Sequence, residues 1–197
     1  MAEHLEIEQK FDVDSGFTRP SFALLAGVNA AGPVLHHLSA TYFDTPDGRL
    51  AASKITLRRR TGGGDAGWHL KLPAGAGARR EIRAPLGPGD EPVPDELAAR
   101  VAEVTAGQPL APIAVLDTER TVVSLNGADG ELLAEVADDS VTAWRLPDRG
   151  EPQRWREVEV EVPQRAPGLQ RAAAELLLSA GARPAGHGSK LARLLHS

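Results

Sequence analysis

The sequence predicts an α+β protein in which roughly eight strands form a closed antiparallel β-barrel with helices outside it. Segments that alternate between apolar and polar residues recur along the chain, whereas only a few segments have the apolar spacing of a helix. Short turns rich in glycine, proline and aspartate separate the strand segments, as in antiparallel hairpins. The chain has 197 residues without internal repeat or low-complexity linker, so a single domain over 1–197 is expected.

The first part of the chain is expected to supply five strands, over residues 5–13, 38–44, 55–61, 67–72 and 79–84. A short helix is expected over 20–27, because proline is favoured in the first turn of a helix. Gly62, Gly63 and Gly64 suggest a phosphate-binding loop, but no Gly-Lys-Ser/Thr follows them. A hairpin turn between the strands at 55–61 and 67–72 explains them better.

The second part predicts a helix over 95–106, ended by Gly107, and then a hairpin formed by 118–125 and 131–138. Trp144 is assigned to a further short strand, and residues 155–162 alternate strictly. A helix over 169–179 is expected to pack on the barrel, and 189–195 are expected to form one or two helical turns.

Composition excludes several classes of protein. There is no cysteine, which excludes disulfides and thiol chemistry. The formal net charge is −5, which argues against general nucleic-acid binding. The N-terminus lacks a basic segment followed by an apolar one, and no run of about 18 apolar residues occurs, so we expect neither signal peptide nor membrane span. These features predict a cytoplasmic protein, and they leave open whether it is a monomer or a homodimer.

Charged residues recur at every second position in several predicted strands, and therefore share one face. Examples are Glu6 with Glu8 and Lys10, Arg58 with Arg60, and Glu159 with Glu161. One interpretation is a set of solvated outer faces. The other is a barrel whose charged face lines the lumen, where acids would bind divalent cations and bases would bind an anion. A triphosphate with Mg²⁺ or Mn²⁺ needs that mixture, because phosphate oxygens favour arginine and lysine while these cations favour carboxylates.

The pattern resembles the CYTH family. Glu6-Ile7-Glu8-Gln9-Lys10 resembles the family's ExExK signature on the first strand. The similarity continues in order through Tyr42 to Pro46, Leu57 to Arg60, Trp68 to Lys71, Arg79 to Glu81, Thr118 to Arg120, Glu135 to Asp139, Glu159 to Glu161, and Ser189-Lys190. Nine matching segments in the right order are far more specific than the short signature alone.

The resemblance implies an eight-stranded triphosphate tunnel and an activity such as inorganic triphosphatase, thiamine triphosphatase, RNA triphosphatase or adenylyl cyclase. It implies catalytic roles for Glu6, Glu8, Lys10, Glu159 and Glu161. Phosphates would be bound by Lys10, Arg58, Arg60, Lys71, Arg79, Arg120 and Lys190. Mg²⁺ or Mn²⁺ would be bound by Glu6, Glu8, Glu81, Asp139, Glu159 and Glu161.

Two details of the site stay open at this level. Alternation from Glu135 favours Asp139 over Asp138 as the inward aspartate, but a bulge would reverse the choice. Glu157 faces the same way as Glu159, with a place at the barrel rim as the alternative to the lumen. Arg79 is preferred to Arg80 because it shares a face with Glu81.

The leading functional prediction is metal-dependent hydrolysis of a triphosphate, with inorganic tripolyphosphate as the first substrate and thiamine triphosphate as the second. One alternative is adenylyl cyclase, although no adenine pocket is evident in the sequence. The other is a module that binds polyphosphate without cleaving it. The complete set of acids favours the enzyme over the binding module.

Overall fold

The computed structural model describes residues 2–75, 78–87, 92–162 and 167–196. Eight antiparallel strands close into a barrel in the order β1-β6-β5-β4-β3-β7-β8-β9, and β9 pairs back with β1. The barrel strands are β1 (Ala2–Val13), β3 (Val34–Asp44), β4 (Thr56–Thr61), β5 (Gly67–Pro73), β6 (Ala78–Ala84), β7 (Ala111–Asn126), β8 (Leu132–Arg145) and β9 (Gln153–Val162). The predicted eight-stranded antiparallel barrel with outer helices is therefore confirmed.

Two short strands extend the sheet beyond the barrel: β2 (Asn29–Ala30) pairs with β7, and β10 (Arg183–Pro184) pairs with β1. The helices are η1 (Phe22–Leu24), α1 (Arg49–Ala52), α2 (Asp95–Arg100), α3 (Ala102–Thr105), α4 (Pro167–Ser179) and α5 (Lys190–His196). None of the helices in the described residues is long and apolar enough to cross a membrane.

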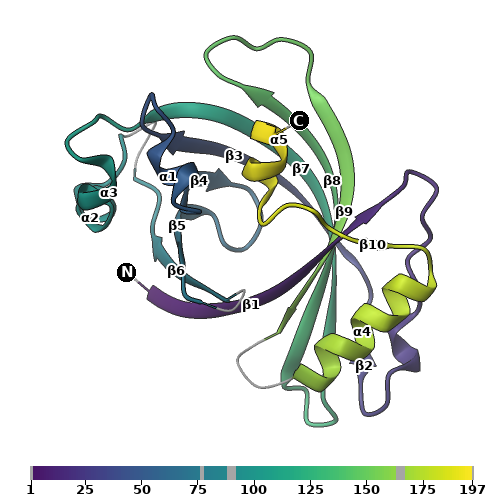
Figure 1. The fold of residues 1–197 in the computed structure, drawn as a ribbon. Coiled ribbons are helices and arrows are strands. Elements are labelled where there is room, and N and C mark those ends of the chain that lie inside the picture. Colours follow the sequence, from purple (N-terminus) through teal and green to yellow (C-terminus); the bar gives the residue numbers. More distant parts are fainter. Residues whose placement is uncertain (1, 76–77, 88–91, 163–166, 197) are drawn as a thin grey trace.

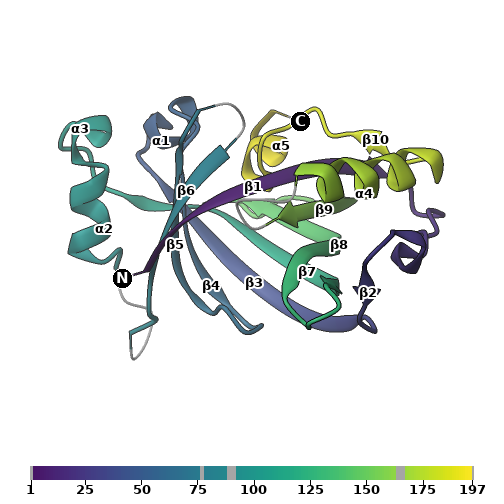
Figure 2. The same ribbon diagram turned by 90° about the horizontal axis from the view of Figure 1, so that it is seen from below.

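Apolar side chains on the outside of the barrel form two separate cores. Under α4, Phe11, Val158 and Val160 pack against Ala173 and Leu177. On the other side, strands β4 to β6 bury a second cluster that includes Leu57, Trp68, Leu70, Leu50 and Leu97, under α1 to α3. Figure 1 shows α4 beside the long strands and α2 and α3 on the opposite side of the molecule, and Figure 2 shows the same separation after rotation.

A third apolar cluster lies inside the barrel at α5. Strand register places Leu38, Ala40 and Tyr42 on the same face as Arg120 and Asp139, which is the lumen face. Leu191 and Leu194 of α5 pack against lumen-facing residues of this cluster, Ala40, Tyr42, Leu116, Val141 and Ala143. The last helix therefore packs on inward-facing side chains, whereas α4 packs on outward-facing ones.

Some predicted elements differ from the structure. The helix expected over 20–27 is one 3₁₀ turn, Phe22–Leu24, because Leu25 is already extended. The helix expected over 95–106 is interrupted at Val101, whose backbone is not helical. Trp144 lies near the end of β8 and not in a separate strand. The prediction of a turn at the three glycines agrees with the structure: Gly62 has φ 79°, and a Cβ there would lie 2.0 Å from the carbonyl oxygen of His37.

Candidate active site

Charged side chains from most of the barrel strands meet in a cavity of ≈ 60 Å³ inside the barrel. All the site residues predicted from the sequence line this cavity except Asp139, which lies directly behind Lys190 and Arg120. The alternation of the strands explains the convergence, since paired residues such as Lys10 and Glu159 lie on the same side of the sheet. The structure thus brings the predicted acids and bases together.

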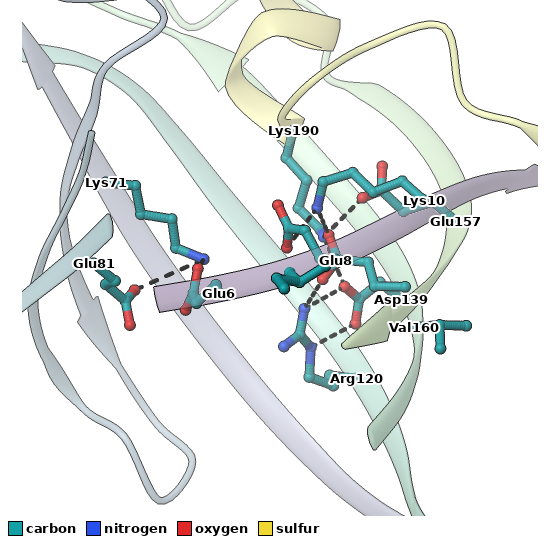
Figure 3. Close-up of polar contacts among 12 residues, drawn as sticks. Glu6, Glu8, Lys10, Lys71, Glu81, Arg120, Asp139, Glu157, Val160 and Lys190 are labelled. Atoms are coloured by element: carbon teal, nitrogen blue, oxygen red, sulfur yellow. Dashed lines mark hydrogen bonds and ion pairs between the residues drawn. The ribbon is translucent and has the colours of Figure 1, made fainter. Parts of the chain in front are cut away.

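Lys190 is enclosed by three carboxylates. Its Nζ lies 2.8 Å from Asp139 Oδ2, 2.7 Å from Glu157 Oε1 and 2.7 Å from Glu159 Oε1. Burial disfavours the charged form of Lys190, but these three acids together raise its pKa well above its usual value. The N–H of Ala192 donates to Ser189 Oγ at 3.1 Å, which caps α5 and fixes Lys190 at the start of that helix. Figure 3 shows Lys190 approaching the acids from above.

Glu159 also pairs with two other bases. Arg120 donates to Glu159 Oε2 at 2.7 Å and, through a forked contact, to Asp139 at 2.8 and 2.6 Å. Lys10 contacts Glu159 and lies 3.2 Å from Glu8 Oε2. Burial favours the neutral acid, but the three cations hold the pKa of Glu159 well below its usual range. This part of the lumen is therefore densely paired and contains Lys10, Arg120 and Lys190 as positive groups.

A second paired group lies at the other end of the ExExK segment. Lys71 Nζ is 2.5 Å from Glu6 Oε2 and 3.7 Å from Glu81 Oε1. Glu81 is also bonded by His69 Nδ1, which lies 2.8 Å from Oε1, and by Arg83. Despite burial, the His69 hydrogen bond and Lys71 lower the pKa of Glu81, so its carboxyl group is ionised at neutral pH.

Glu161 lies between these groups and has no direct cationic partner. It makes no hydrogen bond or ion pair with the part of the chain that the structure describes, although Lys71 acts on it at longer range. Burial, and then the negative charges of Glu6 and Glu8, raise its pKa to about 7. Glu161 is thus the acid whose negative charge is least neutralised here, since Glu6 pairs with Lys71, and Lys10 and Lys71 outweigh burial and lower the pKa of Glu8.

Arg58 and Arg60 extend the positive side of the lumen. Arg58 donates to the hydroxyl oxygen of Tyr42 at 3.2 Å, and Arg60 pairs with Asp65. Burial, together with the charges of Arg58 and Arg120, lowers the pKa of Arg60 to about 9. The Nε groups of Arg58 and Arg60 are both buried without a hydrogen-bond partner among the described residues. Such donors are costly to bury unpaired, and an anion bound by the same two guanidinium groups would offset that cost.

The donor set fits a hard divalent cation. Carboxylate oxygens are the preferred protein ligands of Mg²⁺ and Mn²⁺, and the raised pKa of Glu161 reports a position where added positive charge would be stabilising. Among the described residues, two groups have ligand atoms that all lie within 4.8 Å of one another: His4, Glu6 and Glu81, and Asp139, Glu157 and Glu159; Glu6, Glu8 and Glu161 are spaced more widely. In the second group, Lys190 already provides the cation.

Both details left open by the sequence are visible in the structure. Asp139 faces the lumen, whereas Asp138 faces outward and pairs with Arg156 at 2.8 Å. Glu157 is not at the rim; it is 3% exposed and accepts from Trp155 Nε1 at 2.6 Å. Strand alternation already places Glu157 beside Glu159, but its contact with Lys190 depends on where α5 lies.

The sequence analysis also missed residues that contact the predicted site. His4 Nε2 lies 3.1 Å from Glu81 Oε2, Arg83 pairs with Glu81, and Tyr42 contacts Arg58. Alternation from Glu6 and Glu81 could have indicated His4 and Arg83. The contact between Tyr42 and Arg58 could have been found only from the register of β3 against β4.

Comparison with known proteins identifies the family. The CYTH domain model matches residues 4–193, and the chain therefore belongs to the CYTH domain family. Two Mycobacterium tuberculosis proteins, Rv2226 from strain H37Rv and MT2285 from strain CDC 1551, are each 47% identical to it over 208 residues. The matches cover 98% of this chain, which spans about 40% of the length of either relative.

Solved structures share the fold. A putative adenylate cyclase from Bacillus halodurans superposes with a TM-score of 0.64 at 19% identity, covering 98% of both chains. A putative adenylyl cyclase from Hippeastrum, HpAC1, described as having a dominant triphosphatase activity, gives 0.59 at 17% identity, covering 98% of this chain and 95% of that one. At these identities, the similarity establishes the barrel architecture alone.

Proposed function

We propose that this protein hydrolyses a triphosphate in a divalent-metal-dependent reaction inside the barrel. The observation that carries the proposal is the division of charge in the lumen. Glu161, beside the paired acids Glu6 and Glu8, leaves negative charge incompletely neutralised, and Arg58 and Arg60 leave buried donors without partners among the described residues. A triphosphate with bound Mg²⁺ or Mn²⁺ supplies both missing charges.

The metal, when bound, would withdraw charge from phosphate oxygens and lower the pKa of a coordinated water. Glu6, Glu8 and Glu161 would hold it, and Glu81 lies beside Glu6 through their shared partner Lys71. Asp139 and Glu159 have their carboxylates directed to Arg120 and Lys190 instead. We therefore assign these two acids mainly to positioning the bases.

The bases would bind and orient the phosphates. Lys10, Arg120 and Lys190 form one positive group, and Arg58 and Arg60 of β4 also line the cavity. Lys71 and Arg79 also line it. In the reaction, the oxygen of water bonds to the terminal phosphorus while the bond to the bridging oxygen breaks. The products are orthophosphate and the shortened phosphate. Because phosphoryl transfer depends mainly on positioning and charge stabilisation, a fixed set of bases suits it.

The test is phosphate release from tripolyphosphate, thiamine triphosphate and ATP with Mg²⁺ or Mn²⁺. The native chain is compared with Glu6→Gln combined with Glu8→Gln, and with Glu175→Gln, at an exposed position of α4, as the matched control. We expect release by the native chain and the control, and its loss in the double variant. Tight polyphosphate binding without release by the folded native chain would favour a binding module, and cyclic AMP formed from ATP would favour a cyclase.

A further inference from the structure

A second cavity adjoins the lumen between α1 and α5. It measures ≈ 630 Å³ and shares Thr56, Arg79 and Ser189 with the lumen cavity. A group attached to a triphosphate in the lumen could therefore extend into it. We call this cavity the α1–α5 pocket. Its volume lies in the usual range of small-molecule sites.

The lining of the α1–α5 pocket is apolar with a basic margin. Ile55, Leu191 and Leu195 supply apolar surface, and small alanines on both helices leave the space open. Lys54 and Arg79 contribute positive charge, and no acid occurs among the described residues that line the pocket. A cationic group would lack a counter-charge there, whereas an uncharged organic group could bury apolar surface.

We propose that the α1–α5 pocket binds the uncharged organic group of a triphosphate ester, such as a nucleoside triphosphate, in preference to a cationic group such as thiamine. This inference rests on the proposed function, because it requires the phosphates to lie in the lumen. It names the substrate class: an organic triphosphate whose phosphates contact the lumen bases and whose neutral group lies on Ile55 and Leu191. The basic margin would contact the phosphate that joins the two parts.

The experiment compares ligands with the same triphosphate group. Calorimetry measures the Kd of ATP, methyl triphosphate and thiamine triphosphate for the native chain without added metal. We expect ATP to bind at least about tenfold more tightly than methyl triphosphate, the gain from burying on the order of 55 Å² of apolar surface. Thiamine triphosphate should bind more weakly than ATP.

Variants locate the effect. Ala192→Phe fills the pocket from α5, and Ala52→Phe fills it from α1 at an exposed position that puts the fold less at risk. Each variant should make the Kd of ATP similar to that of methyl triphosphate, and should leave the Kd of methyl triphosphate within about twofold of its native value. Ala98→Phe, at a half-buried helical alanine outside both cavities, is the matched control and should change neither. Lys54→Glu should raise the affinity for thiamine triphosphate relative to that for ATP by about threefold or more.

The outcomes separate this inference from the proposed function. Equal affinities for ATP and methyl triphosphate would overturn the α1–α5 pocket as a binding site, even if tripolyphosphate were hydrolysed. An ATP advantage that survives both filling variants would do the same. Tighter binding of thiamine triphosphate than of ATP would overturn the preference for an uncharged group. If no triphosphate binds even after Mn²⁺ is added, both the inference and the proposed function fail.

Discussion

Replacing Glu161 with glutamine tests whether the lumen holds an acid that needs a bound cation. Burial and the charges of Glu6 and Glu8 raise the pKa of Glu161 to about 7, against an ordinary value of 4.5. This difference corresponds to roughly 3 kcal/mol between the two protonation states. Glutamine has nearly the same shape and no charge, so the substitution removes the cost of ionisation and leaves the packing in place.

The direction of the pH dependence of stability follows from proton binding. Between pH 4.5 and 7, the folded chain keeps a proton on Glu161 that the unfolded chain has lost. The stability contributed by this group therefore falls as the pH rises through that window, and stays low above it. We expect Glu161→Gln to be stabilising by up to roughly 3 kcal/mol at pH 8 and nearly neutral at pH 4.5.

Urea unfolding at the two pH values, in EDTA, measures this difference. When saturating Mn²⁺ is then added, it should stabilise the native chain more than it stabilises the Glu161→Gln variant, because the variant lacks the carboxylate ligand. Glu175→Gln, with its exposed side chain, should stay within about 0.5 kcal/mol throughout. An equal gain at both pH values, or a loss at pH 8, would refute the reasoning.

Three further predictions follow from the contacts. Mn²⁺ with tripolyphosphate should raise the Tm by more than the sum of the shifts that either gives alone; additive shifts would count against joint binding in the lumen. Lys190→Met should destabilise the fold by about 3–5 kcal/mol in urea unfolding, because three buried carboxylates lose their shared cation; a loss below 1 kcal/mol would contradict this. Asp44→Ala should cost at least about 2 kcal/mol in the same assay, since Asp44 accepts backbone N–H groups of Thr45, Leu50 and Ala51 at 2.7–2.9 Å; unchanged stability would show that this cap is dispensable.

Much of the lumen could be predicted from strand alternation. A period of two assigns Glu6, Glu8 and Lys10 to one face wherever β1 begins, and the same rule selects Asp139 over Asp138 because no bulge intervenes between Glu135 and Asp139. The family resemblance then assigned that face to the lumen, which periodicity alone leaves open between the inside and the outside.

Strand lengths were harder to predict. β7 begins at Ala111 and β8 continues to Arg145, well beyond the segments expected from the sequence. The added start of β7, from Ala111 to Asp117, is mostly apolar and contains Pro112, which disfavours a strand assignment, but pairing with β3 and β8 keeps it extended. The sequence pattern also does not reveal the break at Val101. Leu97 and Val101 are four positions apart in the sequence and both are buried, as they would be in one continuous helix.

Contacts between distant segments could not be predicted. The enclosure of Lys190 joins β8, β9 and α5, and the α1–α5 pocket joins two helices that lie about 140 residues apart in the sequence. Both depend on α5 packing on the inward-facing residues Ala40, Leu116 and Val141. Nothing in the short apolar pattern of α5 distinguishes that position from the outer surface.

Hydrolysis of tripolyphosphate in ¹⁸O-labelled water tests the central claim most directly. The native chain is incubated with Mn²⁺ and, separately, with EDTA, and the orthophosphate is analysed by mass spectrometry. We predict orthophosphate carrying one ¹⁸O atom from the water, formed with Mn²⁺ and not in EDTA. Absence of release with Mn²⁺, or equal release in EDTA, would contradict metal-dependent hydrolysis in the lumen.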